Sequence, residues 1–177
     1  MPAVTKSADI SPCGTYRYRL TRSWDDQASI MRFIMLNPST ADADVDDPTI
    51  RRCMGFARRE GCGSIVVVNL FAYRATKPAD LTEAIMERHS HAWEGREAIN
   101  QEIARAALSQ RAGNPAPVVA AWGANWRALS RRGISRPSVE SYAEKVGAKL
   151  TCLGLTGQGD PRHPLYVKGD APLVAYR

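Results

Sequence analysis

An apolar run that ends in polar residues offers the first candidate for chemistry. Residues 32–37, RFIMLN, are apolar on both faces until Asn37, and Pro38 follows. A carboxamide has no useful basicity, so Asn37 can orient a water molecule by hydrogen bonding but cannot take its proton. Alternatively, Asn37 opens an Asx turn before Pro38, and the two interpretations carry equal weight.

His163 is the strongest candidate among the three histidines. It lies between Arg162 and Pro164 in a loop without helical or strand periodicity, so core packing accounts for it poorly. A neutral imidazole can donate one hydrogen bond to a developing anion. His89 and His91 lie in a polar segment near a helix start, and we expect them to be surface residues or local caps.

Asn69 ends a second apolar run, SIVVVN at residues 64–69. Its amide offers a donor and an acceptor that suit the Watson–Crick edge of a nucleobase, although it can equally cap the strand end. Phe71 or Tyr73 could stack on that base, a contact worth about 1–3 kcal/mol. Such aromatic residues are more often part of the core.

The acidic loop after Pro38 suggests a rival chemistry. Four aspartates follow within six residues: Asp42, Asp44, Asp46 and Asp47. The spacing resembles the opening of a calcium loop, but Asp47 stands where the turn glycine belongs and Cys53 where the closing glutamate belongs. A metal-dependent phosphoesterase would need only two of these carboxylates. We expect Asp47 to cap a helix and one of the other three to act as a base in the cleft.

Composition limits the class of protein. A chain of 177 residues with 44% hydrophobic content fits one domain, 1–177, in which we expect residues 1–13 to be loosely ordered. No segment resembles a membrane span or a signal peptide, so we predict a cytoplasmic protein. The cysteines lack a C-x-x-C pair, and we predict reduced thiols, no structural metal and no cofactor.

The net charge of +6 favours a polyanionic partner, DNA or a nucleotide, and no obligate protein partner is evident. Basic residues cluster at Arg51, Arg52, Arg58 and Arg59, and at Arg127, Arg131, Arg132 and Arg136. We expect Arg131, Arg132 and Arg136 to contact phosphate groups. Solvated helix faces are an equally good explanation of these pairs.

The candidate residues must be positioned by strands and helices. Residues 15–20 alternate like an edge strand, and apolar runs predict four buried strands, at 32–37, 64–69, 117–123 and 149–155. Capping residues and helical spacing predict helices at 48–60, 90–110 and 137–147, and a short helix at 124–132.

This alternation predicts an α/β fold of three layers, α/β/α, with a central, mostly parallel four-stranded sheet and an N-terminal edge strand or hairpin. In such folds the ligand binds outside the carboxyl ends of the strands. Asn37, Asn69, Gly123 and His163 all lie at or after predicted strand ends, so we expect them to converge on one cleft.

Four motifs in order, MLNPST, VVNLFAYRAT, VVAAWG and GDPRHPLY, resemble an uncharacterised bacterial family, domain of unknown function 1643 (DUF1643), over residues 15–170. The same set is distantly similar to the uracil-DNA glycosylase superfamily. Residues 35–39 would match its G-x-x-P-G or G-I-N-P-G type motif, Asn69 its base-reading strand, and His163-Pro164 its H-P-S-P type loop.

The chain departs from that superfamily at several positions. Met35 replaces the leading glycine, Ser39 replaces the closing glycine, and Leu165 and Tyr166 follow His163-Pro164 where a serine and a small residue or proline are usual. These changes could narrow the pocket or abolish glycosylase activity. The dispersed cysteines give no sign of the iron-sulfur cluster of some branches.

The resemblance implies a uracil-DNA glycosylase-like fold and a DNA-binding hydrolase, of the kind used in DNA repair, that cleaves the bond between base and sugar. Asn37 would position water and His163 would stabilise the departing base. The base contacts would be Ser39, Asn69, Phe71 and Tyr73, and the wedge that replaces a flipped base would be Leu165 or Tyr166.

Two other functions fit the same residues. A nucleotide or nucleic-acid sensor could keep the cleft without the chemistry, and a metal-dependent phosphoesterase could use the loop 42–47. The sequence leaves open which base is bound, and whether it is carried by DNA or by a free nucleotide.

Overall fold

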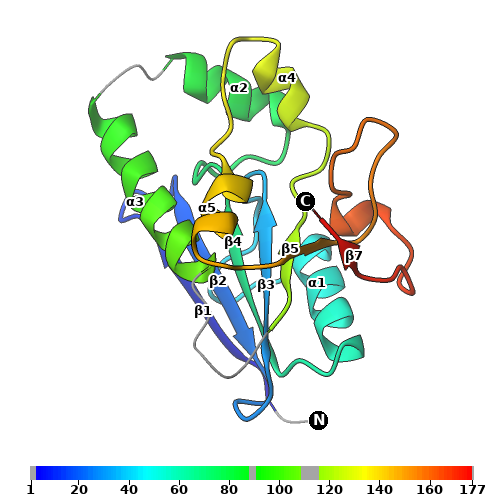
Figure 1. Cartoon of the computed structure of the whole chain (residues 1–177). Coiled ribbons are helices and arrows are strands. Elements are labelled where there is room, and N and C mark those ends of the chain that lie inside the picture. The colour runs from blue at the N-terminus through cyan, green and yellow to red at the C-terminus, as the bar shows by residue number, and fades with distance from the viewer. Residues whose placement is uncertain (1–2, 88–90, 109–115, 177) are drawn as a thin grey trace.

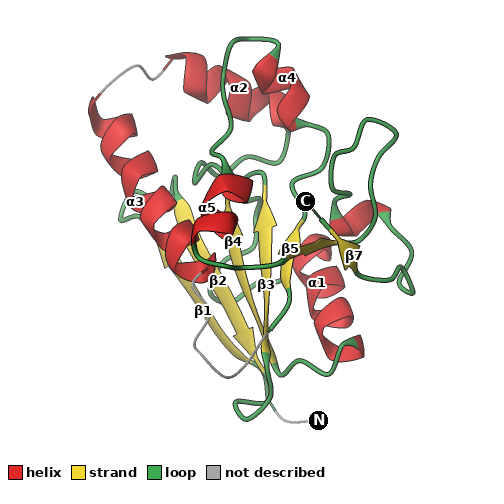
Figure 2. Ribbon diagram, in the orientation of Figure 1, coloured by secondary structure: helices red, strands yellow, loops and turns green. Residues whose placement is uncertain are grey.

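The computed structural model describes residues 3–87, 91–108 and 116–176, except the side chains of 91–96. Its sheet is flanked by helices on both sides (Figures 1 and 2). The strands are β1 (Thr5–Ile10), β2 (Arg17–Ser23), β3 (Ile30–Met35), β4 (Ser64–Asn69), β5 (Val118–Ala120), β6 (Leu150–Cys152) and β7 (Val174–Ala175). The helices are α1 (Pro48–Arg59), α2 (Pro78–Glu87), α3 (His91–Leu108), α4 (Trp126–Ser130), α5 (Val139–Lys145) and the 3-10 turn η1 (Pro164–Tyr166).

The α/β class is confirmed, but the sheet is larger than expected. The strands within the described residues form one seven-stranded sheet, in the order β1-β2-β4-β3-β5-β6-β7. β3 runs parallel to β4 and β5, and β6 continues the parallel part beside β5. β1, β2 and β7 pair antiparallel. The predicted four-stranded sheet with an N-terminal edge strand or hairpin was therefore too small: the antiparallel pair β1–β2 corresponds to the hairpin alternative, whereas β7 was not expected.

The structure corrects two expectations about the N-terminal region. Within residues 1–13, which we expected to be loosely ordered, residues 5–10 form β1 and pair with β2. For the same reason β2 is not an edge strand, because it lies between β1 and β4. The residues of β1 are exposed or half-buried, and none is fully buried, so this edge strand needs no apolar alternation in its sequence.

Alternation along the central strands divides the core between two faces. One face packs on α1 and includes Phe33, Val67, Val119 and Ile50. The other packs on α2, α3 and α5 and includes Ile34, Val68, Ala120, Leu81, Leu108 and Val139. Because the parallel strands are covered on both faces, they are apolar at nearly every position. No described helix is long and apolar enough to cross a membrane.

The connections leave β3 and β5 toward opposite faces of the sheet. β3 leads into α1, whereas β5 leads through α4 into α5, which packs on the other face. Since β3 and β5 are neighbours, the chain diverges between their carboxyl ends. Such a switch point leaves a crevice, and it is where ligands bind in open α/β sheets.

The acidic loop after β3 is part of the fold. Asp47 caps α1, because its Oδ1 accepts a hydrogen bond from the backbone N–H of Ile50 at 2.9 Å, as expected. The Asp42 carboxylate accepts hydrogen bonds from the backbone N–H groups of Asp44 and Val45 at 2.9 and 2.8 Å.

Asp46 serves as the partner of a buried arginine. Arg22 is fully buried, and its Nε donates to Asp46 Oδ1 at 2.6 Å, while Lys6 Nζ lies 3.1 Å from Asp46 Oδ2. Burial disfavours the charged form of Asp46, but the hydrogen bonds from Arg22 and Lys6 outweigh it and lower the pKa of this carboxyl. The acidic loop therefore holds β1, β2 and α1 together.

The Asp46→Asn variant would leave the Arg22 guanidinium without its counter-charge. Arg22 keeps backbone acceptors, so we expect the free energy of unfolding at pH 7, measured by urea denaturation, to fall by about 3 kcal/mol. Asp44→Asn, which alters an exposed loop residue, should cost less than about 0.5 kcal/mol.

The same pair of variants gives a pH test. Because the folded pKa of Asp46 is lowered, its contribution is present above the unfolded value of about 3.9 and is lost as the pH falls through the folded value. The stability gap between Asp46→Asn and the unmodified chain should therefore shrink in acid. A stability gap that does not change with pH would contradict the structural role of Asp46. An equal loss of stability in Asp44→Asn would also contradict it.

Candidate functional site

A cleft of about 390 Å³ opens at the carboxyl ends of the parallel strands. Its walls come from the segment after β3, the segment after β5 and the loop that carries η1. Asn37 and His163 both line it, as do Ser39, Leu165 and Tyr166. The structure therefore brings the carboxamide and the imidazole singled out in the sequence to one cavity.

The Asn37 amide is held in one orientation. Its Nδ2 donates to the backbone oxygens of Ala75 at 2.8 Å and Pro38 at 3.0 Å. The backbone N–H of Ala75 in turn donates to Pro38 O at 2.9 Å, which ties the Asn-Pro-Ser turn to the segment after β4. Oδ1 has no hydrogen-bond partner among the described residues, so this oxygen is available as an acceptor.

The His163 ring is fixed through its other nitrogen. Nδ1 accepts a hydrogen bond from the backbone N–H of Leu165 at 3.3 Å, so the neutral ring carries its proton on Nε2. Burial lowers the pKa of His163 from its ordinary value, against the opposing effect of the Asp47 carboxylate. The imidazole is therefore neutral at pH 7 and offers a single N–H donor.

Gly123 lets the loop that carries His163 lie close to the end of β5. Its φ is +69°, a conformation that L-residues rarely adopt. A Cβ at this position would lie 3.3 Å from Cβ of His163, and the Gly123 N–H donates to Pro161 O at 2.9 Å. A glycine here thus satisfies both the turn and the close contact with His163.

Asp160 anchors the loop that carries His163. Its carboxylate is buried and accepts hydrogen bonds from Trp126 Nε1 at 2.7 Å and from Arg127 Nε at 2.6 Å. On the other side of the loop the Arg52 guanidinium donates to the backbone oxygen of Val167. Sequence reasoning missed Asp160, although an aspartate between glycine and proline in an irregular loop is a signal for such an anchor.

Asn69, Phe71 and Tyr73 lie outside the lining of the cleft, contrary to their predicted base-binding role. Asn69 pairs in register with Met35, which faces α1, so its side chain points to that face and is 1% exposed. Phe71 packs in the core on the other face of the sheet, the face covered by α2, α3 and α5. Tyr73 packs edge-on against Tyr16, with ring centroids 6.0 Å apart.

The predicted phosphate contacts are also elsewhere. Arg131 and Arg132 are exposed but do not line the cleft. Arg136 is paired with Glu140 and does not line the cleft. Its guanidinium lies 4.8 Å from the centroid of the ring of Trp122, which does line it. Among the described residues that line the cleft the cation is Arg162, which sequence reasoning had not selected.

The alternatives based on metal ions gain no support from the geometry. Asp42, Asp44 and Asp46 do not line the cleft, so the expectation that one of them acts there as a base is wrong. The described residues contain no group of three or more His, Cys, Asp or Glu side chains that could hold a metal ion. His89 and the side chain of His91 fall outside the described part of the chain.

A model of a protein family of unknown function (DUF1643) matches residues 17–165. The chain belongs to this family. The DUF1643 match includes Asn37, Gly123 and His163 and ends just before Tyr166. No curated protein and no solved structure matches the chain. The similarity to the uracil-DNA glycosylase superfamily therefore stays a prediction.

Two glycine variants separate backbone strain from the contact with His163. Gly147 has a φ of +67° with no atom near its virtual Cβ, so Gly147→Ala should lower stability by about 1 kcal/mol through strain alone. Gly123→Ala should cost more and should also shift the imidazole resonances of His163 in NMR spectra. Unchanged His163 resonances in Gly123→Ala would contradict the role given to this glycine.

Proposed function

We propose that the cleft binds a nucleobase and hydrolyses the bond that joins the base to its sugar. One observation carries the proposal: an oriented amide oxygen on Asn37 and a neutral N–H donor on His163 line the same cavity from opposite ends of the chain. The distant similarity to the uracil-DNA glycosylase superfamily supports it as well, because two of the four motifs behind that similarity contribute these residues.

The two groups suit the two halves of this reaction. Cleavage of an N-glycosidic bond builds positive charge on the sugar and negative charge on the departing base. Water held by Asn37 Oδ1 adds its oxygen to the sugar carbon while the carbon–nitrogen bond breaks and its electron pair leaves with the base. The His163 Nε2–H stabilises the negative oxygen of that base. The proton released by water ends on the base.

The rim of the cleft fits the recognition of an unstacked base. Leu165 and Tyr166 line the cleft and are 39% and 74% exposed, so both side chains are accessible at its rim. Either side chain could replace a base that has moved out of a stack. Ser39, at the other wall, offers a hydroxyl to the bound base.

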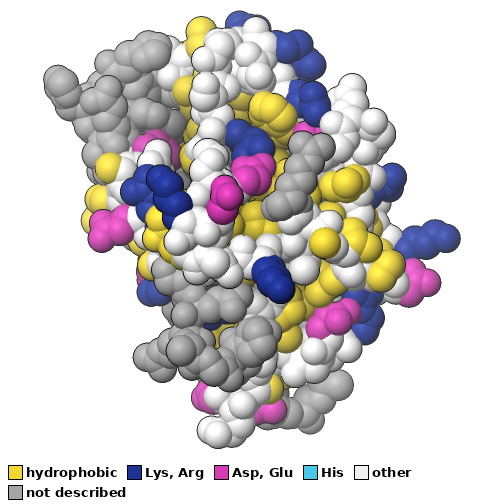
Figure 3. All heavy atoms as spheres, viewed as in Figure 1, with side chains coloured by type: hydrophobic (Ala, Val, Ile, Leu, Met, Phe, Trp, Pro, Cys, Tyr) yellow, Lys and Arg dark blue, Asp and Glu magenta, His cyan; other side chains and the backbone are white. Residues whose placement is uncertain are grey.

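The charges favour a ligand with a single phosphate group over a long duplex. Arg162 lines the cleft, and its Nε is bound to the backbone oxygen of Leu155 at 2.9 Å, which holds the guanidinium in place. On the face seen in Figure 3 most Lys and Arg side chains lie among acidic ones, and a few gather along the upper edge of the view near α4. A nucleotide, or a short single-stranded segment, is therefore the better-supported substrate.

A sensor that binds the same ligand without cleaving it is the second candidate. No Asp or Glu is found among the described residues that line the cleft, and an amide cannot accept the proton of the attacking water. This observation favours slow hydrolysis or none.

The decisive assay incubates the purified protein with nucleotides and oligonucleotides that carry a panel of modified bases, and measures free base and abasic sites. We expect release from at least one substrate. His163→Ala should reduce the rate roughly 100-fold through loss of the donor to the anion, and Asn37→Ala should reduce it by a similar factor while the ligand still binds.

Gln158→Ala is the control, because Gln158 lies in the same loop with an exposed side chain. Its rate should equal that of the unmodified protein. Binding without release in the unmodified protein would support the sensor instead. Absence of both binding and release across the panel would contradict the whole proposal.

A further inference from the structure

The start of α1 forms part of the cleft wall, next to the loop that carries His163. Arg52 ties α1 to that loop, because its Nε donates to the backbone oxygen of Pro164 at 3.4 Å. Thr49 precedes Arg52 by three residues, so both side chains lie on the same side of α1, with Thr49 one turn nearer the start of the helix. Thr49 and His163 both line the cleft. The packing of α1 on the loop therefore places Thr49 on the His163 side of the cavity.

A side-chain hydroxyl on this wall is available to a ligand. Thr49 is half-buried, and its hydroxyl forms no hydrogen bond with the described residues. The hydroxyl of Thr156, which also lines the cleft, differs in this respect. Its Oγ1 accepts hydrogen bonds from the backbone N–H groups of Gln158 at 3.3 Å and Asp160 at 3.1 Å. Thr156 is thus committed to its own loop, whereas Thr49 Oγ1 can bind a ligand.

Thr49 also brings a backbone donor to the same wall. In the first turn of α1, Pro48 has no N–H group. The N–H of Ile50 donates to Asp47 Oδ1 at 2.9 Å, and the N–H of Arg51 donates to Asp47 O at 3.2 Å. The N–H of Thr49 has no acceptor among the described residues. Such a donor at a helix start is satisfied by water or by a ligand.

The charge of Asp47 gives these donors a purpose beside His163. Burial lowers the pKa of His163, and the Asp47 carboxylate opposes that effect, so its negative charge acts on this side of the cleft. The same charge disfavours a developing negative charge on a bound ligand. Hydrogen bonds from Thr49 would add to the one from His163 Nε2–H and offset this repulsion.

We propose that Thr49 is a further ligand contact of the cleft, which donates hydrogen bonds from its hydroxyl and its backbone N–H to the side of the nucleobase that faces His163. The assignment rests on the proposed function, because it takes a nucleobase as the ligand. It applies to a hydrolase and to a sensor, since both bind the base against the same wall. The side of the base next to α1 then carries an acceptor, such as a ring carbonyl oxygen.

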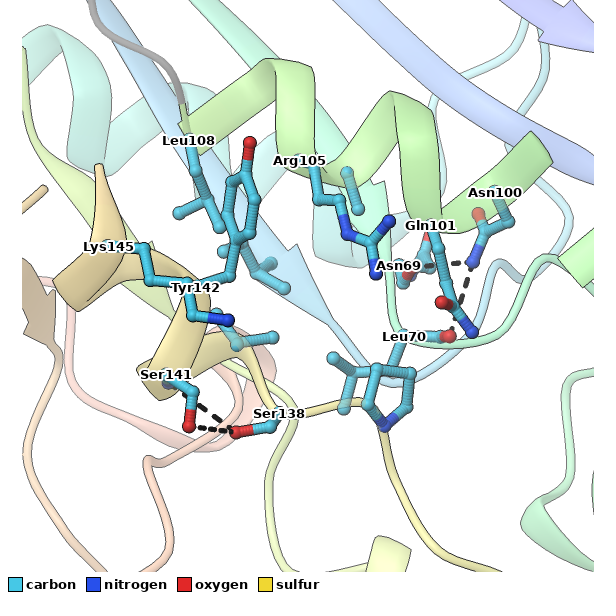
Figure 4. A pocket seen from close by; sticks show the side chains of 14 residues that line it. Asn69, Leu70, Asn100, Gln101, Arg105, Leu108, Ser138, Ser141, Tyr142 and Lys145 are labelled. Atoms are coloured by element: carbon cyan, nitrogen blue, oxygen red, sulfur yellow. Dashed lines mark hydrogen bonds between the residues drawn. The ribbon is translucent and has the colours of Figure 1, made fainter. Parts of the chain in front are cut away.

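NMR titration of the uniformly ¹⁵N-labelled full chain with uracil, thymine, cytosine, hypoxanthine and adenine tests this contact. At least one base should bind and shift the backbone amide resonance of Thr49 together with the imidazole resonances of His163. Ser141 provides the reference, because it lines the cavity between α3 and α5 that Figure 4 shows, and that cavity shares no lining residue with the cleft. The backbone amide resonance of Ser141 should not move.

Substitutions at Thr49 separate the hydrogen bond from packing. Thr49→Val keeps the shape of the side chain but removes the hydroxyl, so it should weaken binding of the same base about 10-fold. Thr49→Ser keeps the hydroxyl and loses a methyl group, so its affinity should stay within about 2-fold of the unmodified protein. Ser141→Ala removes a hydroxyl from the other cavity and should not change the affinity. Urea denaturation of each variant checks that it folds.

The outcomes distinguish the Thr49 contact from the function on which it rests. If none of the five bases binds to the unmodified protein, both proposals are wrong. If a base binds and shifts the His163 resonances while the Thr49 amide does not move, only the Thr49 contact is wrong. An equal loss of affinity in Thr49→Val and Thr49→Ser would also overturn it. A shift of the Thr49 amide, with a loss in Thr49→Val that Thr49→Ser restores, supports the contact.

Discussion

The divergence of the chain after β3 and β5 is the constraint on which the candidate site depends. These parallel neighbours end at the same edge of the sheet, yet one continues to α1 and the other to α5 on the opposite face. Backbone cannot fill the space between two connections that turn away from each other. The polar residues that follow the strands therefore line a cavity, and Asn37 is among them.

Most charged side chains near this edge fix the loops and do not face the cavity. Asp46 neutralises the buried Arg22, Asp47 caps α1, and Asp160 binds Trp126 and Arg127 so that the loop with His163 returns over β5. Each carboxylate is satisfied by nearby donors, which keeps the loops in one conformation. The result is a cleft lined by neutral polar groups and a single arginine among the described residues, suited to bind and polarise a ligand without a carboxylate base.

Much of this arrangement could be predicted from the sequence, and the failures have physical causes. The apolar runs identified β3, β4, β5 and β6 because strands buried on both faces are apolar throughout. β1 and β7 were missed because edge strands need little apolar surface, and α2 was missed because Thr76-Lys77-Pro78 reads as a turn. Asn69 was placed correctly at a strand end. The face of the sheet to which its side chain points was not predicted, because it depends on the register of β4 against β3, in which Asn69 pairs with Met35.

The central claim is that Asn37 and His163 contact the same bound ligand, and NMR spectroscopy of the uniformly ¹⁵N-labelled protein tests it most directly. The account predicts that His163 at pH 7 is the neutral tautomer with its proton on Nε2. A saturating concentration of the nucleobase should then shift the Nε2 resonance of His163 and the side-chain amide resonance of Asn37 together. A proton on Nδ1, or a bound base that shifts only one of the two side chains, would contradict the account.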